Sequence, residues 1–278
     1  MIEPKTLQTG ADVAGHYDEL DQIYREIWGE HVHHGLWRTG RERVAEATDA
    51  LADLVAERLA PAPGNQLADI GCGYGKTAAQ LAERLGVSVT GFTLSEAQAE
   101  VARARPGPLT FHVRDWLANQ MPDGSFDHAY AIESTEHIGD KARLFAEVAR
   151  TLRPGGRFVV CAWLSEDTPS RWRVRHLLEP ICREGRLPGM GTRAEYEAWA
   201  AAAGLRLILF EDVSRQVRRT WTIVTRRVFA KLATTHRYRR YLLSEDKHHR
   251  QFALSLPRLI LAYRTGAMRY GVFTFERS

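Results

Sequence analysis

Several features are scarce in this sequence of 278 residues. Its three cysteines, Cys72, Cys161 and Cys182, stand far apart and lack the paired spacing of metal-binding or redox motifs. No apolar run approaches the roughly 20 residues of a membrane-spanning helix. The N-terminal segment 1–20 lacks the apolar centre of a signal peptide. We therefore expect a cytoplasmic protein with reduced thiols and no membrane span.

Lysine is also scarce, since only five of the 38 basic residues are lysine. The formal net charge is +4, but residues 165–250 hold 18 Lys and Arg against 10 Asp and Glu. Two interpretations of this arginine excess stay open. The arginines could bind an anionic part of a substrate, or they could lie on solvated helix faces and reflect genome composition. Hydrophobic residues make up 44% of the chain, as is usual for a globular protein.

Predicted helices and strands alternate through the first part of the chain. Helical periodicity covers 41–60, 76–86, 95–105 and 140–152, and strand-like runs occupy 67–70, 87–93, 109–115, 128–134 and 157–164. This alternation with short loops predicts an α/β fold, in which a mostly parallel sheet has helices on both faces.

The alternation changes after residue 164. A helix is predicted at 192–204 with Thr192 as its N-cap, followed by a strand at 205–213. Residues 270–278 alternate as an edge strand does. We expect six segments: N-terminal helices and a lid at 1–64, an α/β core at 65–165, a cap segment at 166–190, a core continuation at 191–213, a helical cap insertion at 214–266 and a final core strand at 267–278.

The strongest motif is 69-DIGCGYGKT-77, which joins the first predicted strand to a helix. Glycines there let the backbone turn tightly and let a ligand approach closely, at the sheet edge where open α/β folds bind ligands. The spacing excludes a P-loop, whose first glycine would fall at Ile70. It also excludes a dinucleotide fingerprint, whose third glycine would fall at Lys76. The bland alternative is a tight turn between strand and helix.

The spacing D-x-G-x-G-x-G resembles the first motif of class I S-adenosylmethionine (SAM)-dependent methyltransferases. In that family the second strand usually ends in an acidic residue, which is missing here. Instead, 91-GFTLSEAQ-98 is similar to a G-x-T-L-S-x-x-Q pattern of one subfamily. After the third strand, 114-RDW-116 resembles the segment that contacts adenine. The resemblance implies these cofactor contacts: Asp69, Gly71, Cys72, Gly73 and Gly75 in the first motif, Thr93, Leu94 and Gln98 at the ribose, Asp115 at the adenine amine, Trp116 on the ring, and Glu133. The alternatives are a solvated helix face for Gln98 and a core position for Trp116.

The resemblance extends over nearly the whole chain. The segments 17-YDEL-20, 27-IWGEHVHHGLW-37, 133-ESTEH-137 and 263-YRTGAMRYGVFT-274 are similar to the γ-tocopherol methyltransferase-like group. That group includes C-methyltransferases of phenolic prenyl compounds, and its more distant relatives include natural-product methyltransferases and cyclopropane fatty-acid synthases. It implies a Rossmann-like, mostly parallel seven-stranded sheet with a helical N-terminal lid and helical cap insertions.

The segment 30-EHVHHGLW-37 raises the question of a metal, because His31, His33 and His34 lie within four positions. We expect no metal, since no second cluster of Cys, Asp or Glu at ligand spacing is apparent. The resemblance implies instead that this segment folds over the SAM pocket, where aromatic faces suit a sulfonium cation. The bland alternative is a packed helix and loop. The expected cofactor-side residues are Tyr17, His33 and Trp37, and the expected substrate-side residues are Tyr24, Trp28, His34, His137, Trp163 and Trp221.

The chemistry of methyl transfer asks for alignment, exclusion of water and often a proton acceptor. His137 follows the fourth strand and is the preferred base or substrate orienter, because histidine titrates near neutral pH. Glu133 and Glu136 flank it and complete the expected catalytic set. The alternative for His137 is a loop histidine that is hydrogen-bonded to the backbone.

Three functions are compatible with these residues. The preferred one is an S-adenosylmethionine-dependent methyltransferase that acts on a small, largely hydrophobic natural-product-type molecule, with carbon favoured over nitrogen or oxygen as acceptor. A SAM-fold protein that serves as a non-methylating cyclase or binding module is the alternative. A nucleic-acid methyltransferase is disfavoured, because no RNA-binding module accompanies the arginines between 215 and 240. We expect a small-molecule partner and no nucleic acid, and we leave open a homo-oligomer.

Overall fold

The computed structural model describes residues 1–6, 8–10, 12–13, 15, 18, 26–27, 31–236, 238 and 247–278, with only the backbone of 247–254. Three predicted lid residues, Tyr17, Tyr24 and Trp28, lie outside the described residues. Among the described helices, none is long and apolar enough to cross a membrane.

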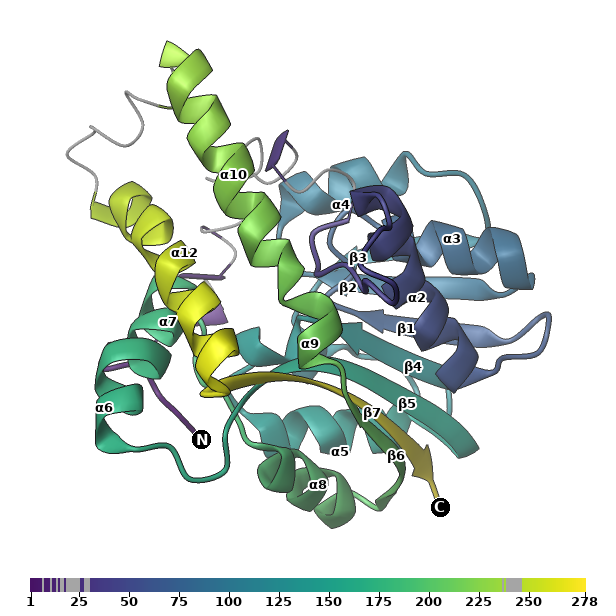
Figure 1. Cartoon of the computed structure of the whole chain (residues 1–278). Coiled ribbons are helices and arrows are strands. Elements are labelled where there is room, and N and C mark those ends of the chain that lie inside the picture. Colours follow the sequence, from purple (N-terminus) through teal and green to yellow (C-terminus); the bar gives the residue numbers. More distant parts are fainter. Residues whose placement is uncertain are drawn as a thin grey trace.

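Within the described residues, seven strands form one sheet in the order β3-β2-β1-β4-β5-β7-β6 (Figure 1). The strands are β1 (Gln66–Ile70), β2 (Ser88–Thr93), β3 (Leu109–Val113), β4 (Phe126–Ile132), β5 (Leu152–Ser165), β6 (Leu205–Asp212) and β7 (Met268–Arg277). Strands β1 to β5 are parallel, and β7 is antiparallel to both of its neighbours. The predicted mostly parallel α/β sheet is confirmed. The strand order reverses between β1 and β4, which is where such sheets bind ligands.

The expectation of an edge strand at 270–278 is wrong. Strand β7 lies between β5 and β6, where Val160 pairs with Phe273 and Leu205 pairs with Arg277. Residues 270–275 of β7 are all buried, because helices cover both faces of the sheet at this position. Gly271 and Thr274 are buried as fully as the aromatic residues Tyr270, Phe273 and Phe275, so the alternation does not mark a solvated face.

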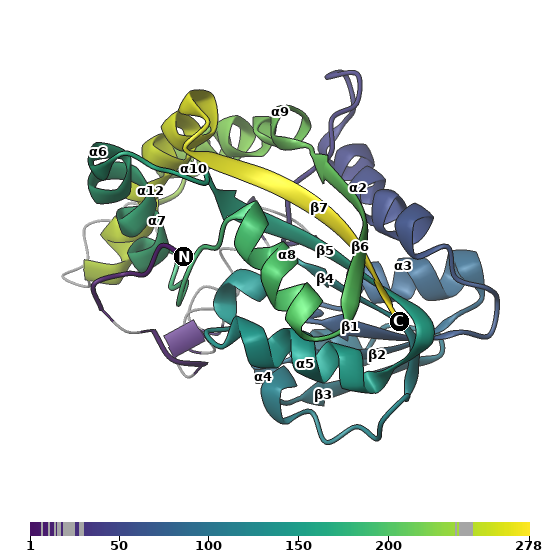
Figure 2. The same ribbon diagram turned by 90° about the horizontal axis from the view of Figure 1, so that it is seen from below.

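Helices cover both faces of the sheet. Figures 1 and 2 show α2 (Val44–Leu59) and α3 (Lys76–Leu85) on one face, and α5 (Lys141–Thr151) and α8 (Arg193–Ala202) on the other. Helix α4 (Glu96–Arg103) connects β2 to β3. Side-chain caps start three of these helices, since Ser95, Asp140 and Thr192 each accept a hydrogen bond from a first-turn backbone N–H. The predicted N-cap Thr192 is confirmed.

Further helices gather beyond the carboxyl ends of β4 and β5 (Figure 1). They are α6 (Arg171–Arg173), the π-helical turn η3 (Val174–Leu178), α7 (Glu179–Glu184), α9 (Ser214–Val217), α10 (Arg219–Thr234) and α12 (Lys247–Thr265). Helix α12 packs against α7, η3 and α10. Two 3-10 turns, η1 (Trp116–Ala118) and η2 (Thr135–His137), follow β3 and β4 and bring their residues to the same end of the sheet.

Candidate active site

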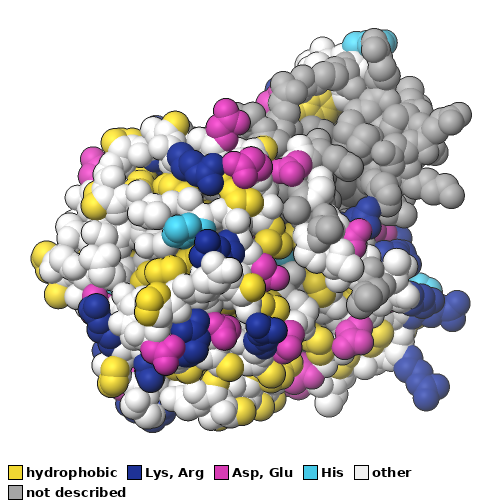
Figure 3. Space-filling view, turned by 180° about the vertical axis from the view of Figure 1, so that it is seen from behind, with side chains coloured by type: hydrophobic (Ala, Val, Ile, Leu, Met, Phe, Trp, Pro, Cys, Tyr) yellow, Lys and Arg dark blue, Asp and Glu magenta, His cyan; other side chains and the backbone are white. Residues whose placement is uncertain are grey.

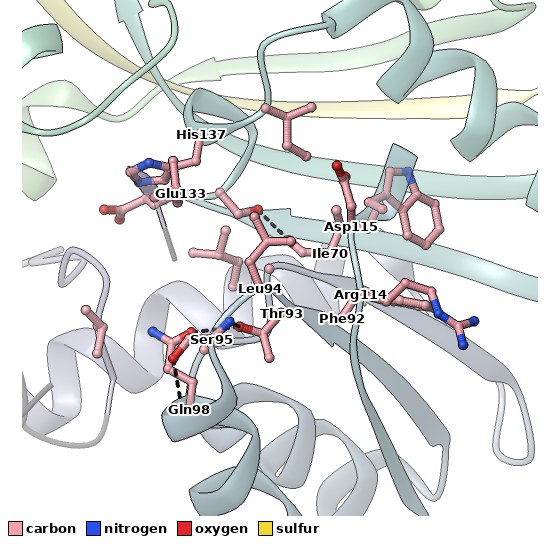
Figure 4. A pocket seen from close by; sticks show the side chains of 18 residues that line it. Ile70, Phe92, Thr93, Leu94, Ser95, Gln98, Arg114, Asp115, Glu133 and His137 are labelled. Carbon is pink, nitrogen blue, oxygen red and sulfur yellow. Dashed lines mark hydrogen bonds between the residues drawn. The ribbon is translucent and has the colours of Figure 1, made fainter. Parts of the chain in front are cut away.

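A cavity with about 760 Å³ of open space lies at the carboxyl ends of β1, β2 and β4 (Figure 4). The sequence-predicted residues that line it are Gly71, Gly73, Thr93, Leu94, Gln98, Asp115, Trp116, Glu133 and His137. Figure 4 shows Glu133 and His137 on one side of this cavity and Asp115 on the opposite side. The cavity therefore joins the residues expected to hold a nucleoside to those expected to face an acceptor.

The three glycines of the first motif have left-handed backbones for different reasons. A Cβ atom on Gly71 would lie 2.2 Å from Cβ of Ser134, and one on Gly75 would lie 2.7 Å from Cζ of Phe111. A Cβ atom on Gly73, where φ is +53°, would meet nothing within 4 Å. Gly73 thus leaves open space beside the cavity, which fits the close approach of a bound cofactor. Gly75 instead permits the packing of α3 and lines no cavity described here.

Two polar side chains at the end of β2 form the base of the cavity. The hydroxyl of Thr93 donates to Oε1 of Gln98 at 2.8 Å, and the backbone N–H of Gln98 donates to Ser95 Oγ at 3.1 Å. Gln98 is buried, so the alternative of a solvated helix face is wrong. Its position is held from two sides, as a residue that orients a ligand requires.

The opposite wall carries Asp115 and Trp116. Asp115 accepts a hydrogen bond from the backbone N–H of Leu117 at 2.9 Å and so begins η1. Trp116 packs edge-on against Phe92, with ring centroids 5.0 Å apart, and belongs to the buried core on that face. Its ring contributes both to the core and to the cavity wall, so the two interpretations of this residue are compatible.

A smaller cavity of about 380 Å³ adjoins the first one. The two share Val32, Gly71, Gly73 and Ile132 in their walls. Asp69, Cys72 and His33 line the smaller cavity and not the larger one. Asp69 accepts a hydrogen bond from the Tyr130 hydroxyl at 2.9 Å. Burial nevertheless raises the pKa of Asp69 to about 7.

The three histidines do not converge on one point. The rings of His31 and His33 contact each other, with 3.0 Å between His33 Nε2 and His31 Nδ1, whereas the ring of His34 contacts Glu133. Among the described residues, no group of three or more His, Cys, Asp or Glu is placed to hold a metal. Trp37, expected at the cofactor, lies elsewhere: its Nε1 donates to the Glu42 carbonyl at 3.2 Å, and it lines neither cavity.

Glu133 follows β4 and has a left-handed backbone with φ of +52°. Oε1 accepts from the His34 backbone N–H at 2.6 Å and from the Tyr270 hydroxyl at 2.8 Å. Oε2 contacts His34 Nδ1 at 2.8 Å and accepts from Trp163 Nε1 at 3.1 Å. Burial alone would raise the pKa of Glu133, but His34 and its hydrogen bonds outweigh burial and lower it to about 2. The residue is therefore a buried carboxylate at neutral pH.

Four aromatic rings surround the imidazole of His34. Their centroids lie 5.2 to 5.8 Å from that of His34, and the rings belong to Trp163, Trp221, Tyr263 and Tyr270. His34, Trp163 and Trp221 are expected on the substrate side; the structure brings them together, but none of the three lines either cavity. The sequence reasoning assigned no role to Tyr263 and Tyr270. The available signal was their place in 263-YRTGAMRY-270, at the junction of α12 and β7.

The other two expected catalytic residues differ in their surroundings. Glu136 lines neither cavity; it accepts hydrogen bonds from the Trp163 backbone N–H and from the Thr135 hydroxyl, and burial raises its pKa to about 7. His137 lines the larger cavity. Burial lowers the pKa of His137 to about 4, so the ring is neutral at pH 7, and the expectation that it titrates near neutral pH is wrong. Its ring also hydrogen-bonds to the backbone of Arg186, which the alternative interpretation required.

The arginines of α10 divide into two kinds. Arg219 and Arg227 donate to the backbone carbonyls of Gly40 and Ile27, and so attach α10 to the N-terminal lid. Arg218, which immediately precedes α10, and Arg226 are exposed and have no such contact with the lid among the described hydrogen bonds. The first pair thus has a structural role that the charge count alone did not reveal.

The family model described as mycolic acid cyclopropane synthetase matches residues 5–253 of this chain. The chain belongs to this family. Its members are SAM-dependent methyltransferases, so this family member is an enzyme of that class with SAM as its cofactor. The open space at Gly73 fits that cofactor. The class I assignment made from the glycine motif is confirmed.

Relatives of this methyltransferase come from a bacterium and from a plant. The 27-O-demethylrifamycin SV methyltransferase of Amycolatopsis mediterranei is 35% identical over 228 residues, which cover 78% of this chain and 82% of the relative. The chloroplastic tocopherol O-methyltransferase of Arabidopsis thaliana is 28% identical over 290 residues, which cover 95% of this chain and 81% of the relative. The expected likeness to tocopherol and natural-product methyltransferases is confirmed.

Solved structures show the same fold. The mycolic acid cyclopropane synthase CmaA1, complexed with SAH and CTAB, has a TM-score of 0.85 and 20% identity, and covers 98% of this chain and 100% of its own. The cyclase SpnF has a TM-score of 0.81 and 26% identity, and covers 100% of this chain and 99% of its own. The class I methyltransferase fold is therefore confirmed.

Proposed function

We propose that this enzyme methylates a small, largely hydrophobic molecule of the natural-product type. The observation that carries the proposal is the larger cavity, which extends from Asp115 to Glu133 and His137, next to the aromatic group around His34. Apolar side chains in the cavity wall, such as Ile70, Phe92 and Ile138, suit an apolar acceptor, and the polar groups between them suit its orientation. The relatives whose names mention rifamycin and tocopherol also support this substrate class.

The residues divide the work of the reaction. SAM supplies an activated methyl group on a sulfonium. Thr93, Gln98 and Asp115, which line the larger cavity, hold its nucleoside part. His137 is neutral at pH 7 and accepts the proton that the acceptor loses. Glu133 keeps His34, Trp163 and Tyr270 in place through its four hydrogen bonds. Burial of these groups excludes water from the acceptor side.

The acceptor atom follows from two lines of support that differ. The likeness to the γ-tocopherol methyltransferase-like group favours carbon, whereas the names of two relatives mention O-methylation. We propose an oxygen acceptor on a phenol or alcohol, because both of those relatives have names that refer to oxygen. Incubation with methyl-labelled SAM and a panel of prenylated phenols, macrolactams and indoles tests this, with the labelled position located by NMR. Label found only on carbon or nitrogen would contradict the oxygen assignment.

A second candidate function is a SAM-fold cyclase that transfers no methyl group. The likeness to SpnF over the whole chain favours it. Production of S-adenosylhomocysteine distinguishes the two, because a cyclase forms product without consuming SAM.

A nucleic-acid substrate has less support: among the side chains coloured in Figure 3, basic and acidic groups are interspersed, and this face has no continuous basic surface.

A further inference from the structure

Two histidines of the lid take no part in the proposed proton transfer, yet they form a chain of contacts. His31 Nε2 lies 3.1 Å from Asp49 Oδ1, and His31 Nδ1 lies 3.0 Å from His33 Nε2. His33 Nδ1 lies 2.9 Å from the backbone oxygen of His34. The chain begins at Asp49, whose side chain is 48% exposed, and ends on the lid backbone above the cofactor cavities.

This chain needs more protons than two neutral imidazoles can supply. The Asp49 carboxylate and the His34 carbonyl are both acceptors, so the ring nitrogens that face them must both carry N–H. The contact between His31 and His33 needs a third proton. Two neutral rings hold two N–H groups between them, so all three contacts are hydrogen bonds only when the pair carries one positive charge.

Charged and titratable groups from every neighbouring element act on this pair. They are Asp49 from α2, Lys76 from α3, Arg105 after α4, Glu133 after β4 and His34 from the lid itself. Asp69 and Cys72 line the smaller cavity with the pair, and Glu26, Arg227 and Lys231 line a third cavity with His31. Burial is the largest influence: it lowers the pKa of His31 to about 2 and lowers that of His33. Lys76 and Arg105 lower the pKa of His31 further. The pair is therefore neutral at pH 7, and the contact between His31 Nδ1 and His33 Nε2 lacks a proton. The Thr77 hydroxyl, 3.4 Å from His31 Nδ1, is the other group beside that nitrogen.

The smaller cavity is the place where a negative charge could change this balance. His31 and His33 line it together with Lys76 and Thr77, whereas the larger cavity combines the rings of Phe92 and Trp116 with polar groups such as Gln98. The adenosine part of SAM suits the rings and polar groups of the larger cavity, and its charged amino-acid part suits the smaller one. The α-carboxylate would then lie beside the histidine pair.

We propose that the His31–His33 pair takes up one proton when the carboxylate of SAM or S-adenosylhomocysteine enters the smaller cavity. The inference rests on the use of SAM by this enzyme and adds a proton-binding site to it. The added proton completes the three hydrogen bonds from Asp49 to the lid backbone. Cofactor binding and fixing of the lid segment 31–34 are thus one coupled event.

Isothermal titration calorimetry tests the coupling directly. S-adenosylhomocysteine is titrated into the full-length protein at pH 7 in phosphate, HEPES and Tris buffers, which exchange protons with different enthalpies. The slope of observed enthalpy against buffer enthalpy gives the number of protons exchanged. Asp69 shares the cavity and can release a proton when the ammonium end binds. Its contribution is common to wild type and His33→Gln, so the difference between them isolates the histidine pair.

We expect wild type to take up between about 0.5 and 1 proton more than His33→Gln, whose amide does not titrate. His31→Gln is a second variant with the same expected result. In the Asp69→Asn protein, we expect S-adenosylhomocysteine to cause proton uptake still. We expect 5′-methylthioadenosine, which lacks the carboxylate, to cause none. This comparison requires no substitution in the lid. If both ligands bind the Asp69→Asn protein and exchange the same number of protons, the inference is overturned and the methyltransferase function is left intact. Failure of the folded wild type to bind S-adenosylhomocysteine would instead contradict the function.

Discussion

Glu133 binds His34 through both of its carboxylate oxygens: Oε1 lies 2.6 Å from the backbone N of His34, and Oε2 lies 2.8 Å from Nδ1 of its ring. One residue belongs to the lid and the other follows a central strand. This contact therefore joins the N-terminal segment to the sheet at the edge of the cavity. The hydroxyl of Tyr270 and the indole of Trp163 extend the same junction to β7 and β5.

Glu133→Gln should loosen this junction, because an amide NH₂ cannot accept the hydrogen bonds that one of the two oxygens accepts. We expect the free energy of unfolding at pH 7 to fall by about 1–3 kcal/mol, measured by urea denaturation. Glu147→Gln, on the half-buried surface of α5, is the matched control with a loss under about 1 kcal/mol. The pKa of Glu133 is lowered to about 2, so its ionisation stabilises the fold above about pH 4.5 and ceases to do so as the pH falls through 2. A difference between wild type and variant that persists unchanged at pH 2.5 would contradict this assignment.

Gly73→Ala should weaken SAM binding at least roughly tenfold, since its methyl group would take space in the cavity that nothing else occupies. The left-handed φ of +53° adds backbone strain. Gly155→Ala is the matched control: its φ is +76°, its Cβ also meets nothing within 4 Å, and it lies away from both cavities. Similar losses of affinity in the two variants would show that strain, and not occupied space, is the cause.

His137→Ala should lower kcat by roughly 10²–10⁴-fold with little effect on SAM affinity, if the ring accepts the proton. His176→Ala, at an exposed position of η3 that lines neither cavity, is the control with unchanged kcat. Because burial lowers the pKa of His137 to about 4, the ring stays unprotonated from pH 6 to 8. We expect kcat/KM for the acceptor to be free of a histidine ionisation in that range. If kcat/KM falls below about pH 6.5 in wild type and this fall is absent in His137→Ala, the pKa of His137 is higher than its burial implies.

Asp69→Asn should change how stability depends on pH in the cofactor-free protein. Burial raises the pKa of Asp69 to about 7, above its value of 3.8 in an unfolded chain. The stability that its protonated form contributes is therefore full below about pH 3.8 and is lost as the pH rises through 7. We expect wild type to lose about 2 kcal/mol relative to Asp69→Asn between pH 5 and pH 7, measured by urea denaturation at each pH. If the free energy of unfolding changes with pH in the same way in the two proteins, the Asp69 carboxyl is not neutral at pH 5.

The parts of the site that the sequence predicted are those encoded by local spacing. The turn at 71–75 and the Thr93–Gln98 contact each depend on a few neighbouring residues, because the alternation of strands and helices brings their loops to one edge of the sheet. The spacing did not distinguish the roles of the glycines. Gly75 serves helix packing against Phe111, which lies on a strand far along the chain.

The parts that escaped prediction depend on contacts between distant segments. Tyr263 and Tyr270 reach His34 from more than 200 residues away, and no local pattern records which rings will meet. Trp37 illustrates the opposite error: an aromatic residue in the lid segment was expected at the cofactor, but it packs beneath Arg219 instead. The alternating pattern of β7 was read correctly as a strand. The pattern did not predict the position of β7 in the sheet, because this position depends on which elements cover the other face of the strand.

The interior position of β7 has a consequence for biosynthesis. Among the described strands, β6 reaches the rest of the sheet through β7, and β5 has β7 as its partner on that side. While the ribosome is still making residues 268–277, β5 presents an open edge and β6 has no strand to pair with. Such edges are templates for pairing with other chains. The nascent protein is therefore prone to aggregation until β7 is made. A premature stop before Met268 would remove β7, leave β6 without a partner strand and expose the edge of β5.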